Sequence, residues 1–209
     1  LIGNTKSLLE MPAGDHRFTD LKDQSVVVLG GGDTAMDCVR TAVRQGAREV
    51  HCLYRRDREN MPGSQREVDN AIEEGVQFRF NVQALEVIQE QGSATAVRVV
   101  ETRLGLPDES GRQRPEIIDG SETNIEADAV IVAYGFQASP ESWFETFDIQ
   151  TNQWGLVEAS ESDPFPFQTS NPKVFAAGDM VRGADLVVTA VADARKAAEG
   201  IVDFLEHKT

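Results

Sequence analysis

The sequence predicts an α/β fold that combines a parallel sheet, flanked by helices, with an antiparallel β-meander. The first observation is the run Val26–Leu29, four apolar residues followed by a glycine-rich turn and an amphipathic segment. The second is that strand-like and helix-like segments alternate as far as about residue 80, which is typical of a parallel sheet. The third is that polar and apolar residues alternate in the segments after residue 84, as they do in antiparallel strands.

The first strand-helix-strand unit is expected over residues 26–54. Residues 26–29 are long enough for a buried strand, and the apolar spacing from about Asp33 to Gln45 predicts a helix. Gly46 can adopt the left-handed conformation that ends many helices, so we expect it to cap this one. A second buried strand should run from Val50 to Tyr54.

A second helix and a third strand are expected to complete this half of the fold. Met61-Pro62-Gly63 predicts a turn, and Ser64-x-x-Glu67 has the spacing of a capping box at the start of a helix. That helix should stop near Gly75, and a strand should follow over 76–80. This order is that of a mononucleotide-binding half of a doubly wound fold.

An antiparallel meander is expected after residue 84. Its three segments are residues 84–90, 95–105 and 116–126. Gly92, Gly120 and the stretch 107–115 carry the turn signals, and that stretch should be an exposed tip. Residues 129–133 should then return to the parallel sheet as a buried strand.

The last third of the chain has a different composition. Six aromatic residues fall within 25 positions, and we expect them to pack in a core or between domains rather than to stack on a ligand: Trp143, Phe144, Phe147, Trp154, Phe165 and Phe167. A strand is expected over 173–177, running into a turn at Gly178 and Asp179. A helix should open near Gly183 and reach about Glu206.

The turn after the first strand carries the fingerprint of a Rossmann-like dinucleotide-binding domain. It reads Gly30-Gly31-Gly32-Asp33-Thr34-Ala35, in which residues 30, 32 and 35 hold the three small positions of the pattern. Small residues permit a tight turn and let backbone N–H groups approach a pyrophosphate at a helix N-terminus. A glycine turn that only packs a helix on a sheet is the alternative.

The end of the second strand indicates which dinucleotide is bound. An NAD-specific domain usually carries an acidic residue there to accept from the ribose 2′-hydroxyl, whereas this chain has Arg55 and Arg56. Guanidinium groups bind phosphate in a bidentate manner, so these residues predict the 2′-phosphate of NADPH. With Arg58 they form a local basic spot on an acidic chain.

Composition excludes several classes of partner. The chain has 20 Lys plus Arg against 35 Asp plus Glu, a net charge of −15, which disfavours nucleic acid and anionic membrane surfaces. With no signal peptide and no apolar run near 18 residues, we expect a cytoplasmic protein. Because it begins with Leu1 rather than Met, we also expect it to be a fragment of a longer protein.

Neither cysteine nor histidine predicts a reactive or metal site. Cys38 and Cys52 are far apart in sequence and fall on predicted buried positions, so we expect structural thiols. His16, His51 and His207 have no metal-ligand spacing among them, so no metal site is expected.

The motifs together resemble one flavoprotein family. GGGDTAMD (30–37) with YRRD (54–57), followed by AAGD (176–179) with GADLVVTAV (183–191), is similar to the glutamate synthase small (beta) subunit family. The similarity runs over nearly the whole chain and is most specific at residues 26–80 and 171–203. The related thioredoxin reductases carry a CxxC dithiol in this domain, and its absence argues against that branch.

In that family an NADPH domain is inserted in an FAD domain. The resemblance therefore implies that residues 25–135 bind NADPH and that residues 1–24 and 136–209 form a partial FAD-binding domain. By position, the resemblance implies that the NADPH pyrophosphate is bound by Gly30, Gly31, Gly32, Asp33, Thr34 and Ala35, and its 2′-phosphate by Arg55 and Arg56. The nicotinamide side would be lined by Ala133, Tyr134 and Gly135. FAD would be contacted by Gly178, Asp179, Leu186, Val187 and Val188.

Two parts of the family pattern have no counterpart before Gly30: the first FAD fingerprint and the cysteines that hold iron–sulfur clusters. Two cysteines cannot ligate a cluster that usually takes four. We therefore expect the isolated chain to hold only part of the flavin site and to be inactive, with the clusters in a missing N-terminal part.

The resemblance implies a function for the parent protein. It should move a hydride from NADPH to FAD and pass electrons through iron–sulfur clusters to the large glutamate synthase subunit or another acceptor protein. Hydride transfer between aligned rings needs no side-chain acid or base, so no catalytic residue is expected. The alternatives are another NADPH:flavin oxidoreductase, such as a ferredoxin-linked transhydrogenase or pyrimidine reductase, and a non-catalytic nucleotide-binding or docking module.

Overall fold

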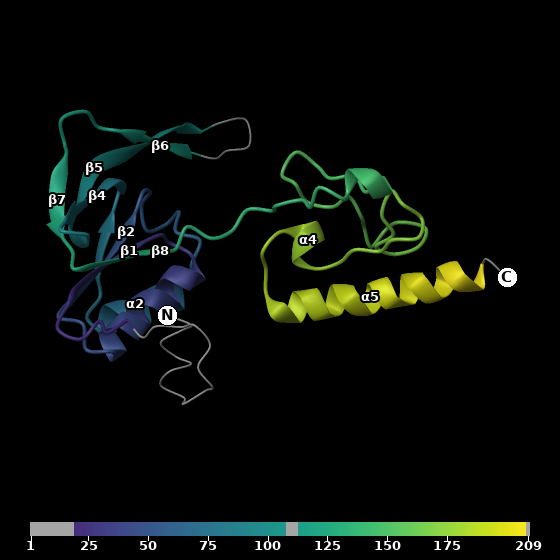
Figure 1. Cartoon of the computed structure of the whole chain (residues 1–209), viewed down its shortest axis with the longest axis horizontal. Coiled ribbons are helices and arrows are strands. Elements are labelled where there is room, and N and C mark those ends of the chain that lie inside the picture. The colour runs from purple at the N-terminus through teal and green to yellow at the C-terminus, as the bar shows by residue number, and fades with distance from the viewer. Residues whose placement is uncertain (1–18, 108–112, 208–209) are drawn as a thin grey trace. The chain divides into compact units, whose positions relative to one another are not determined.

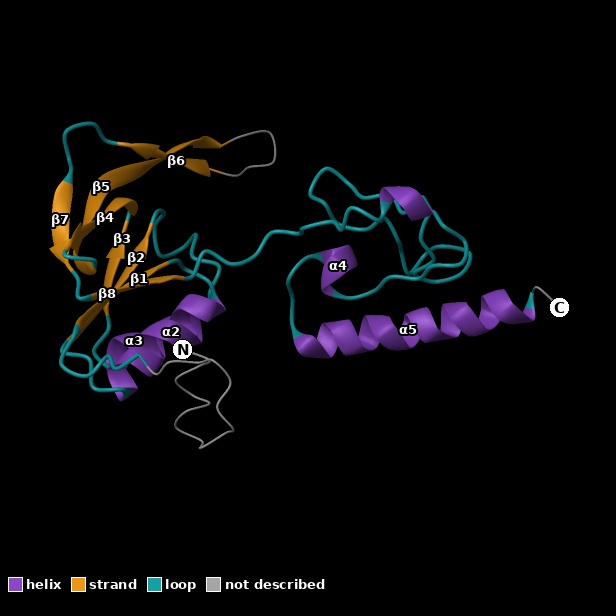
Figure 2. Cartoon of the chain, viewed as in Figure 1, coloured by secondary structure: helices purple, strands orange, loops and turns teal. Residues whose placement is uncertain are grey.

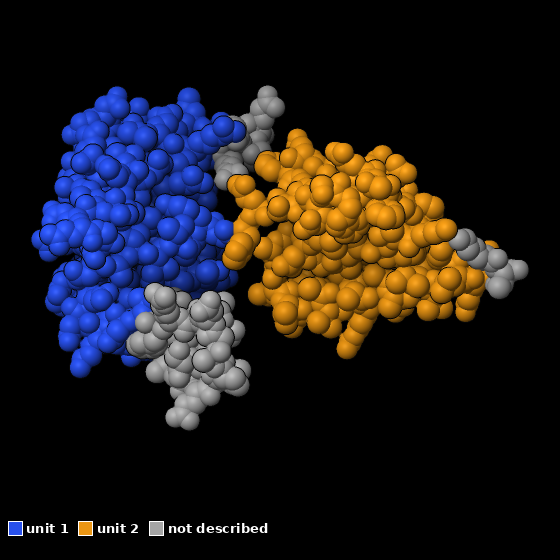
Figure 3. All heavy atoms as spheres, viewed as in Figure 1, with its two compact units in different colours: residues 1–135 blue, residues 136–209 orange. Residues whose placement is uncertain are grey.

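The structure, a computed structural model, describes residues 19–107 and 113–207. It divides into two compact units, residues 1–135 (unit 1) and 136–209 (unit 2), which Figure 3 shows in different colours. Figure 1 shows the same chain coloured by residue number. The predictions for residues 1–18, including His16, and for the centre of the 107–115 tip lie outside the described residues. Within the described ranges, no helix combines the length and the apolar composition needed to cross a membrane.

Unit 1 contains the predicted parallel sheet. Its strands are β1 (Ser25–Leu29), β2 (Glu49–Tyr54), β3 (Gln77–Phe80) and β8 (Ala129–Val132), in the spatial order β3-β2-β1-β8. All three pairings are parallel, and β1 pairs with both β2 and β8. The predicted strands at 26–29, 50–54, 76–80 and 129–133 are therefore confirmed, each within one residue of its expected ends.

Two helices connect these strands. Helix α2 (Asp33–Arg44) ends where Gly46 takes a φ of 84°, as expected for a glycine cap. Helix α3 (Gln65–Glu73) begins after Ser64 and ends before Gly75, again at positive φ. Arg40 on α2 donates to Glu74 Oε1 (3.0 and 2.9 Å) and pairs with Glu67.

The predicted capping box is wrong in its contacts. Ser64 is the N-cap residue, but its side chain makes no capping hydrogen bond, and the Glu67 carboxylate pairs with Arg40 instead of reaching back. The charge of Arg40 on the neighbouring helix is a stronger partner for a carboxylate than one backbone N–H.

The antiparallel meander has four strands where three were expected. They are β4 (Val82–Glu90), β5 (Ser93–Pro107), β6 (Gln113–Ile117) and β7 (Thr123–Glu126). The expected segment 116–126 is broken by Gly120, which has a φ of 77°. The first half of β5 pairs with β4 and β7, and its second half pairs with β6. The described residues of the expected tip, 107 and 113–115, therefore all belong to strands.

Unit 1 has three layers, which are the helices, the parallel sheet and the meander (Figure 2). An apolar core lies on each face of the parallel sheet. Val26 and Val28 of β1 point to the helix side, where they belong to one core with Met36 of α2 and Val68 of α3. Val27 and Leu29 point to the other side, where they pack with β5 and β7. Both faces of β1 are covered, which explains why the strand is apolar at the four positions after Ser25.

Unit 2 is mostly irregular chain around a small core. Its elements are a 3-10 turn η1 (Glu145–Phe147), a short helix α4 (Asp179–Arg182) and a long helix α5 (Val187–Glu206). Phe144, Ile149, Val157 and Ala176 form its core. Helix α5 lies against the loop at Pro166, where a Cβ on Gly200 would stand 2.3 Å from the carbonyl oxygen.

Three predictions for unit 2 need correction. The strand expected over 173–177 is only an isolated bridge between Gln168 and Phe175, because no described strand pairs along it. The helix expected from Gly183 begins at Val187, because Gly183 has a φ of 90° and separates α4 from α5.

The third concerns the aromatic residues. Phe144 and Phe167 are buried, as expected of a core, but Trp154 is 69% exposed. Trp143 and Phe147 are about half exposed and contact each other edge to face. Phe165 packs edge to face on Phe204 of α5.

Candidate nucleotide-binding site

The glycine turn after β1 is enclosed on two sides. Gly30 has a φ of 146°, and a Cβ there would lie 2.2 Å from the carbonyl oxygen of Ala133 at the end of β8. A Cβ on Gly31 would lie 2.4 Å from the ring of Tyr54, the last residue of β2. These two glycines are therefore required for the turn to fit between its neighbouring strands.

Gly32 differs from the other two glycines because it faces open space. It is the N-cap of α2 with an extended backbone, and a Cβ there would have no neighbouring atom within 4 Å. Ala35 and Met36 donate their backbone N–H groups to the Gly32 carbonyl (2.9 and 3.2 Å). The helix dipole favours an anion at this N-terminus.

A second loop closes one side of this turn. Gly63 donates its backbone N–H to the Gly31 carbonyl (2.8 Å), and the backbone N–H of Ser64 donates to Asp33 Oδ1 (2.9 Å). Asp33 therefore connects the first turn of α2 to the start of α3. Its side chain and that of Thr34 are exposed, whereas Ala35 is buried against the sheet.

The three arginines after β2 have different surroundings. Arg58 pairs with Asp69 and donates to Gln65 Oε1 (3.2 Å), so it is not part of a free basic spot as the sequence suggested. Arg55 and Arg56 have no carboxylate partner within residues 19–107 and 113–207. Arg56 Nε donates to Tyr54 Oη (3.0 Å).

The backbone that carries Arg55 and Arg56 is fixed from the meander. Thr102 on β5 donates its hydroxyl to the Arg55 carbonyl (2.9 Å), and the backbone N–H of Asn81 donates to the Arg56 carbonyl (3.0 Å). The role of Asn81 and Thr102 could not be read from the sequence, because it depends on contacts between segments far apart in the chain.

The residues after β8 face the same end of the sheet. Ala133 is buried and donates its backbone N–H to the Leu29 carbonyl (2.8 Å), whereas Tyr134 and Gly135 are exposed. Partial burial raises the pKa of Tyr134, and the nearby Arg55 guanidinium opposes this shift.

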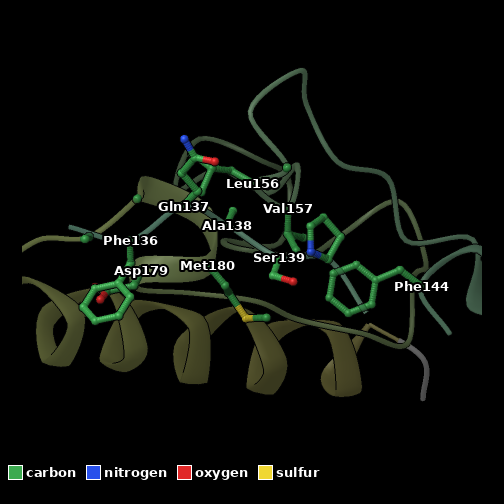
Figure 4. A pocket seen from close by; sticks show the side chains of 13 residues that line it. Phe136, Gln137, Ala138, Ser139, Phe144, Leu156, Val157, Asp179 and Met180 are labelled. Atoms are coloured by element: carbon green, nitrogen blue, oxygen red, sulfur yellow. The ribbon is translucent and has the colours of Figure 1, made fainter. Parts of the chain in front are cut away.

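In unit 2, Asp179 lines a cavity of about 340 Å³ (Figure 4), and Gly178 directly precedes it in the chain. Gly178 has a φ of 73°, and Asp179 begins α4 with an exposed side chain. Met180 and residues 136–140 also line the cavity. The sequence analysis identified Asp179 but not the lining segment 136–140, which has no recognisable motif.

An ion pair fixes α4 against α5. Arg182 donates to both carboxylate oxygens of Asp193 (3.0 and 2.9 Å), and the Asp193 side chain is 4% exposed. This bidentate pair holds the pKa of Asp193 below its usual value. At the N-terminus of α5, the side chains of Leu186, Val187 and Val188 are all exposed.

Both cysteines are buried and unpaired, as expected of structural thiols. Burial raises the pKa of Cys38 and raises that of Cys52 to about 12. Cys52 donates its S–H to the Gly30 carbonyl (3.4 Å), which places it beneath the glycine turn. Among the described residues, no group of three or more His, Cys, Asp or Glu side chains could hold a metal ion.

The residues of unit 1 fit a phosphorylated dinucleotide. Gly32 leaves open space at a helix N-terminus where a pyrophosphate can approach the backbone, and the same edge of the sheet presents two arginines without carboxylate partners. In unit 2, the cavity beside Asp179 can accept a polar part of a ligand, with the carboxylate as hydrogen-bond acceptor.

Comparisons with known proteins identify the relatives of this chain. The sequence profile of the pyridine nucleotide-disulphide oxidoreductases matches residues 5–194. The glutamate synthase [NADPH] small chain of Halomonas elongata is 56% identical over 206 residues, 99% of this chain and 43% of that protein. The Escherichia coli small chain is 54% identical over 208 residues, 99% of this chain and 44% of that protein. The chain therefore spans less than half the length of these relatives, and the resemblance inferred from the motifs is confirmed.

The fold has close counterparts among solved structures. Thioredoxin reductase from T. acidophilum has a TM-score of 0.69 at 20% identity, over 99% of this chain and 57% of that one. At this level of identity the likeness concerns the fold alone, and it confirms the predicted α/β class.

Proposed function

Because the chain belongs to the pyridine nucleotide-disulphide oxidoreductase family, we propose that it is the NADPH-binding part of a flavoprotein oxidoreductase of the glutamate synthase small-subunit type. In this proposal residues 25–135 bind NADPH, and residues 136–209 with 1–24 belong to an FAD-binding domain. Within the range 1–24, however, the side chain of Leu21 packs in the helix-side core of unit 1.

One observation carries the proposal for NADPH. The open position at Gly32 and the two arginines without carboxylate partners follow the ends of adjacent parallel strands, β1 and β2. A pyrophosphate at the N-terminus of α2 would place the adenosine ribose toward the end of β2. Arg55 and Arg56 would then bind its 2′-phosphate, while Ala133, Tyr134 and Gly135 would line the nicotinamide side.

The flavin part of the proposal rests on unit 2. Gly178 and Asp179 would face the pyrophosphate and ribityl chain of FAD, with Asp179 accepting from a hydroxyl. Leu186, Val187 and Val188 would bring the N-terminus of α5 near the flavin ring. Bound flavin supplies the acceptor for the hydride of NADPH, and the protein contributes binding and orientation.

The relatives also support a proposal for the activity of the longer protein. We propose that electrons pass from the flavin through iron–sulfur clusters, held outside this chain, to a large glutamate synthase subunit that forms glutamate from 2-iminoglutarate. The names of the relatives support NADPH as the donor. The setting we propose is the cytoplasm.

The test is calorimetric titration of the chain with NADPH and NADH. The wild-type chain should bind NADPH more tightly, and combining Arg55→Ala with Arg56→Ala should remove most of that preference. Each lost charged hydrogen bond should weaken NADPH binding about tenfold or more, with little effect on NADH.

The matched control removes the same charge elsewhere. Arg114 on β6 and Arg195 on α5 are both exposed, so Arg114→Ala with Arg195→Ala changes the net charge equally. This control should keep the preference for NADPH. If the Arg55 and Arg56 double variant also keeps it, the 2′-phosphate does not bind at the end of β2.

A further inference from the structure

Tyr54 occupies a central position beneath the proposed 2′-phosphate site. It is the last residue of β2, its side chain is 7% exposed, and its ring lies against Gly31 of the glycine turn. The Arg56 Cζ atom lies 5.7 Å from the centre of the Tyr54 ring. One side chain therefore contacts both the turn and one of the two arginines.

The hydrogen bonds of the Tyr54 hydroxyl have only one possible direction. Its single proton is donated to the Asn60 carbonyl (2.7 Å), so the oxygen lone pairs accept from Arg56 Nε (3.0 Å). Asn60 is itself fixed, because its backbone and side-chain N–H groups both donate to Asp57 Oδ1 (2.8 Å each). The acceptor for Arg56 is thus held in place before any ligand binds.

We propose that Tyr54 is a positioning residue that sets the preference for NADPH by holding Arg56 ready for the 2′-phosphate. Because Nε is engaged by Tyr54, the two outer guanidinium nitrogens remain for a phosphate, and the arginine loses little freedom on binding. Arg55, by contrast, is exposed and makes no side-chain hydrogen bond to any residue in the described ranges. This inference rests on the NADPH site proposed above.

The test is Tyr54→Phe, which keeps the ring and removes only the hydroxyl. NADPH binding should weaken about three- to tenfold, the usual effect of losing one such hydrogen bond, while NADH binding should stay the same. In an Arg56→Ala background Tyr54→Phe should have no further effect on NADPH binding, whereas in an Arg55→Ala background its full effect should remain. Thermal unfolding of each variant checks that the chain is folded.

Arg56→Lys provides a second variant in case Tyr54→Phe does not fold. Lysine keeps the charge but has no Nε–H in the guanidinium position, so NADPH affinity should fall to the level expected for Tyr54→Phe. Wild-type affinity in Arg56→Lys would overturn the proposal, because charge alone would then suffice.

The outcomes separate this inference from the proposed function. If Arg56→Ala removes the preference for NADPH but Tyr54→Phe leaves it unchanged, the role of Tyr54 is wrong and the NADPH site stands. If Tyr54→Phe weakens NADPH and NADH equally, Tyr54 has only a structural role and the inference is overturned. Equal binding of NADPH and NADH by the wild-type chain would overturn the proposed site and this inference with it.

Discussion

Alanine substitutions at Gly30, Gly31 and Gly32 should separate folding from nucleotide binding. The three residues are consecutive and the chemical change is the same, but an added Cβ meets a different environment at each. It would meet the Ala133 carbonyl at Gly30, the Tyr54 ring at Gly31, and no atom within 4 Å at Gly32.

The geometry gives an order for the loss of stability. Gly30→Ala combines a φ of 146°, costing about 1–3 kcal/mol for an L residue, with a Cβ placed 2.2 Å from backbone, costing about 1–3 kcal/mol more. Gly31→Ala should cost about 1–3 kcal/mol, because only the Tyr54 ring must move. Gly32 has an ordinary extended backbone, so Gly32→Ala should cost at most about 1 kcal/mol as a poorer N-cap.

The effect of Gly32→Ala on NADPH binding should be large even though its effect on stability is small. Gly32→Ala should leave the chain folded but weaken NADPH binding tenfold or more (on the order of 1.4 kcal/mol), because the methyl group fills the space through which a pyrophosphate approaches the backbone.

Urea unfolding followed by circular dichroism measures the stabilities, since both tryptophans lie in unit 2 and their fluorescence would not report on unit 1. Calorimetry measures the binding. Wild-type NADPH affinity in Gly32→Ala would refute the placement of the pyrophosphate, and a loss of stability equal to that of Gly30→Ala would refute the steric argument.

Two further predictions concern charged and reactive groups. Arg182 holds the pKa of Asp193 below its usual value, so the pair stabilises the fold above the ordinary pKa of an aspartate, and this stabilisation is lost as the pH falls through the lowered pKa. Asp193→Asn should therefore lose less thermal stability than the wild-type chain on acidification; equal acid sensitivity would contradict this role. Cys38 and Cys52 should not react with a disulfide reagent at pH 8 until the chain is unfolded, since both are buried and the pKa of Cys52 is raised to about 12. Rapid reaction of the folded chain would show that these thiols are accessible.

Local sequence patterns were sufficient for most elements of unit 1. The apolar run of β1 and the amphipathic spacing of α2 lie within the elements they specify, and Gly46 and Gly75 directly follow the helix ends they specify. These signals act over a few residues, so they could be read without knowing the fold. In unit 2 the segment 173–177 has the composition of a strand, but a strand also needs a partner, and the described chain supplies only one bridge at Phe175.

The parts of the candidate nucleotide-binding site that depend on local sequence were predictable in the same way. The sequence by itself determined the glycine turn, the helix that follows it and the two arginines at the end of β2, because each depends on residue type and spacing along one segment. Only the tertiary structure decided which charges remain available. Arg58 is paired with Asp69 on α3, and Glu67 binds Arg40 on α2 instead of capping its own helix. The physical reason is that an ion pair or hydrogen bond forms with the nearest suitable group in space, and packing rather than chain order brings that group within reach.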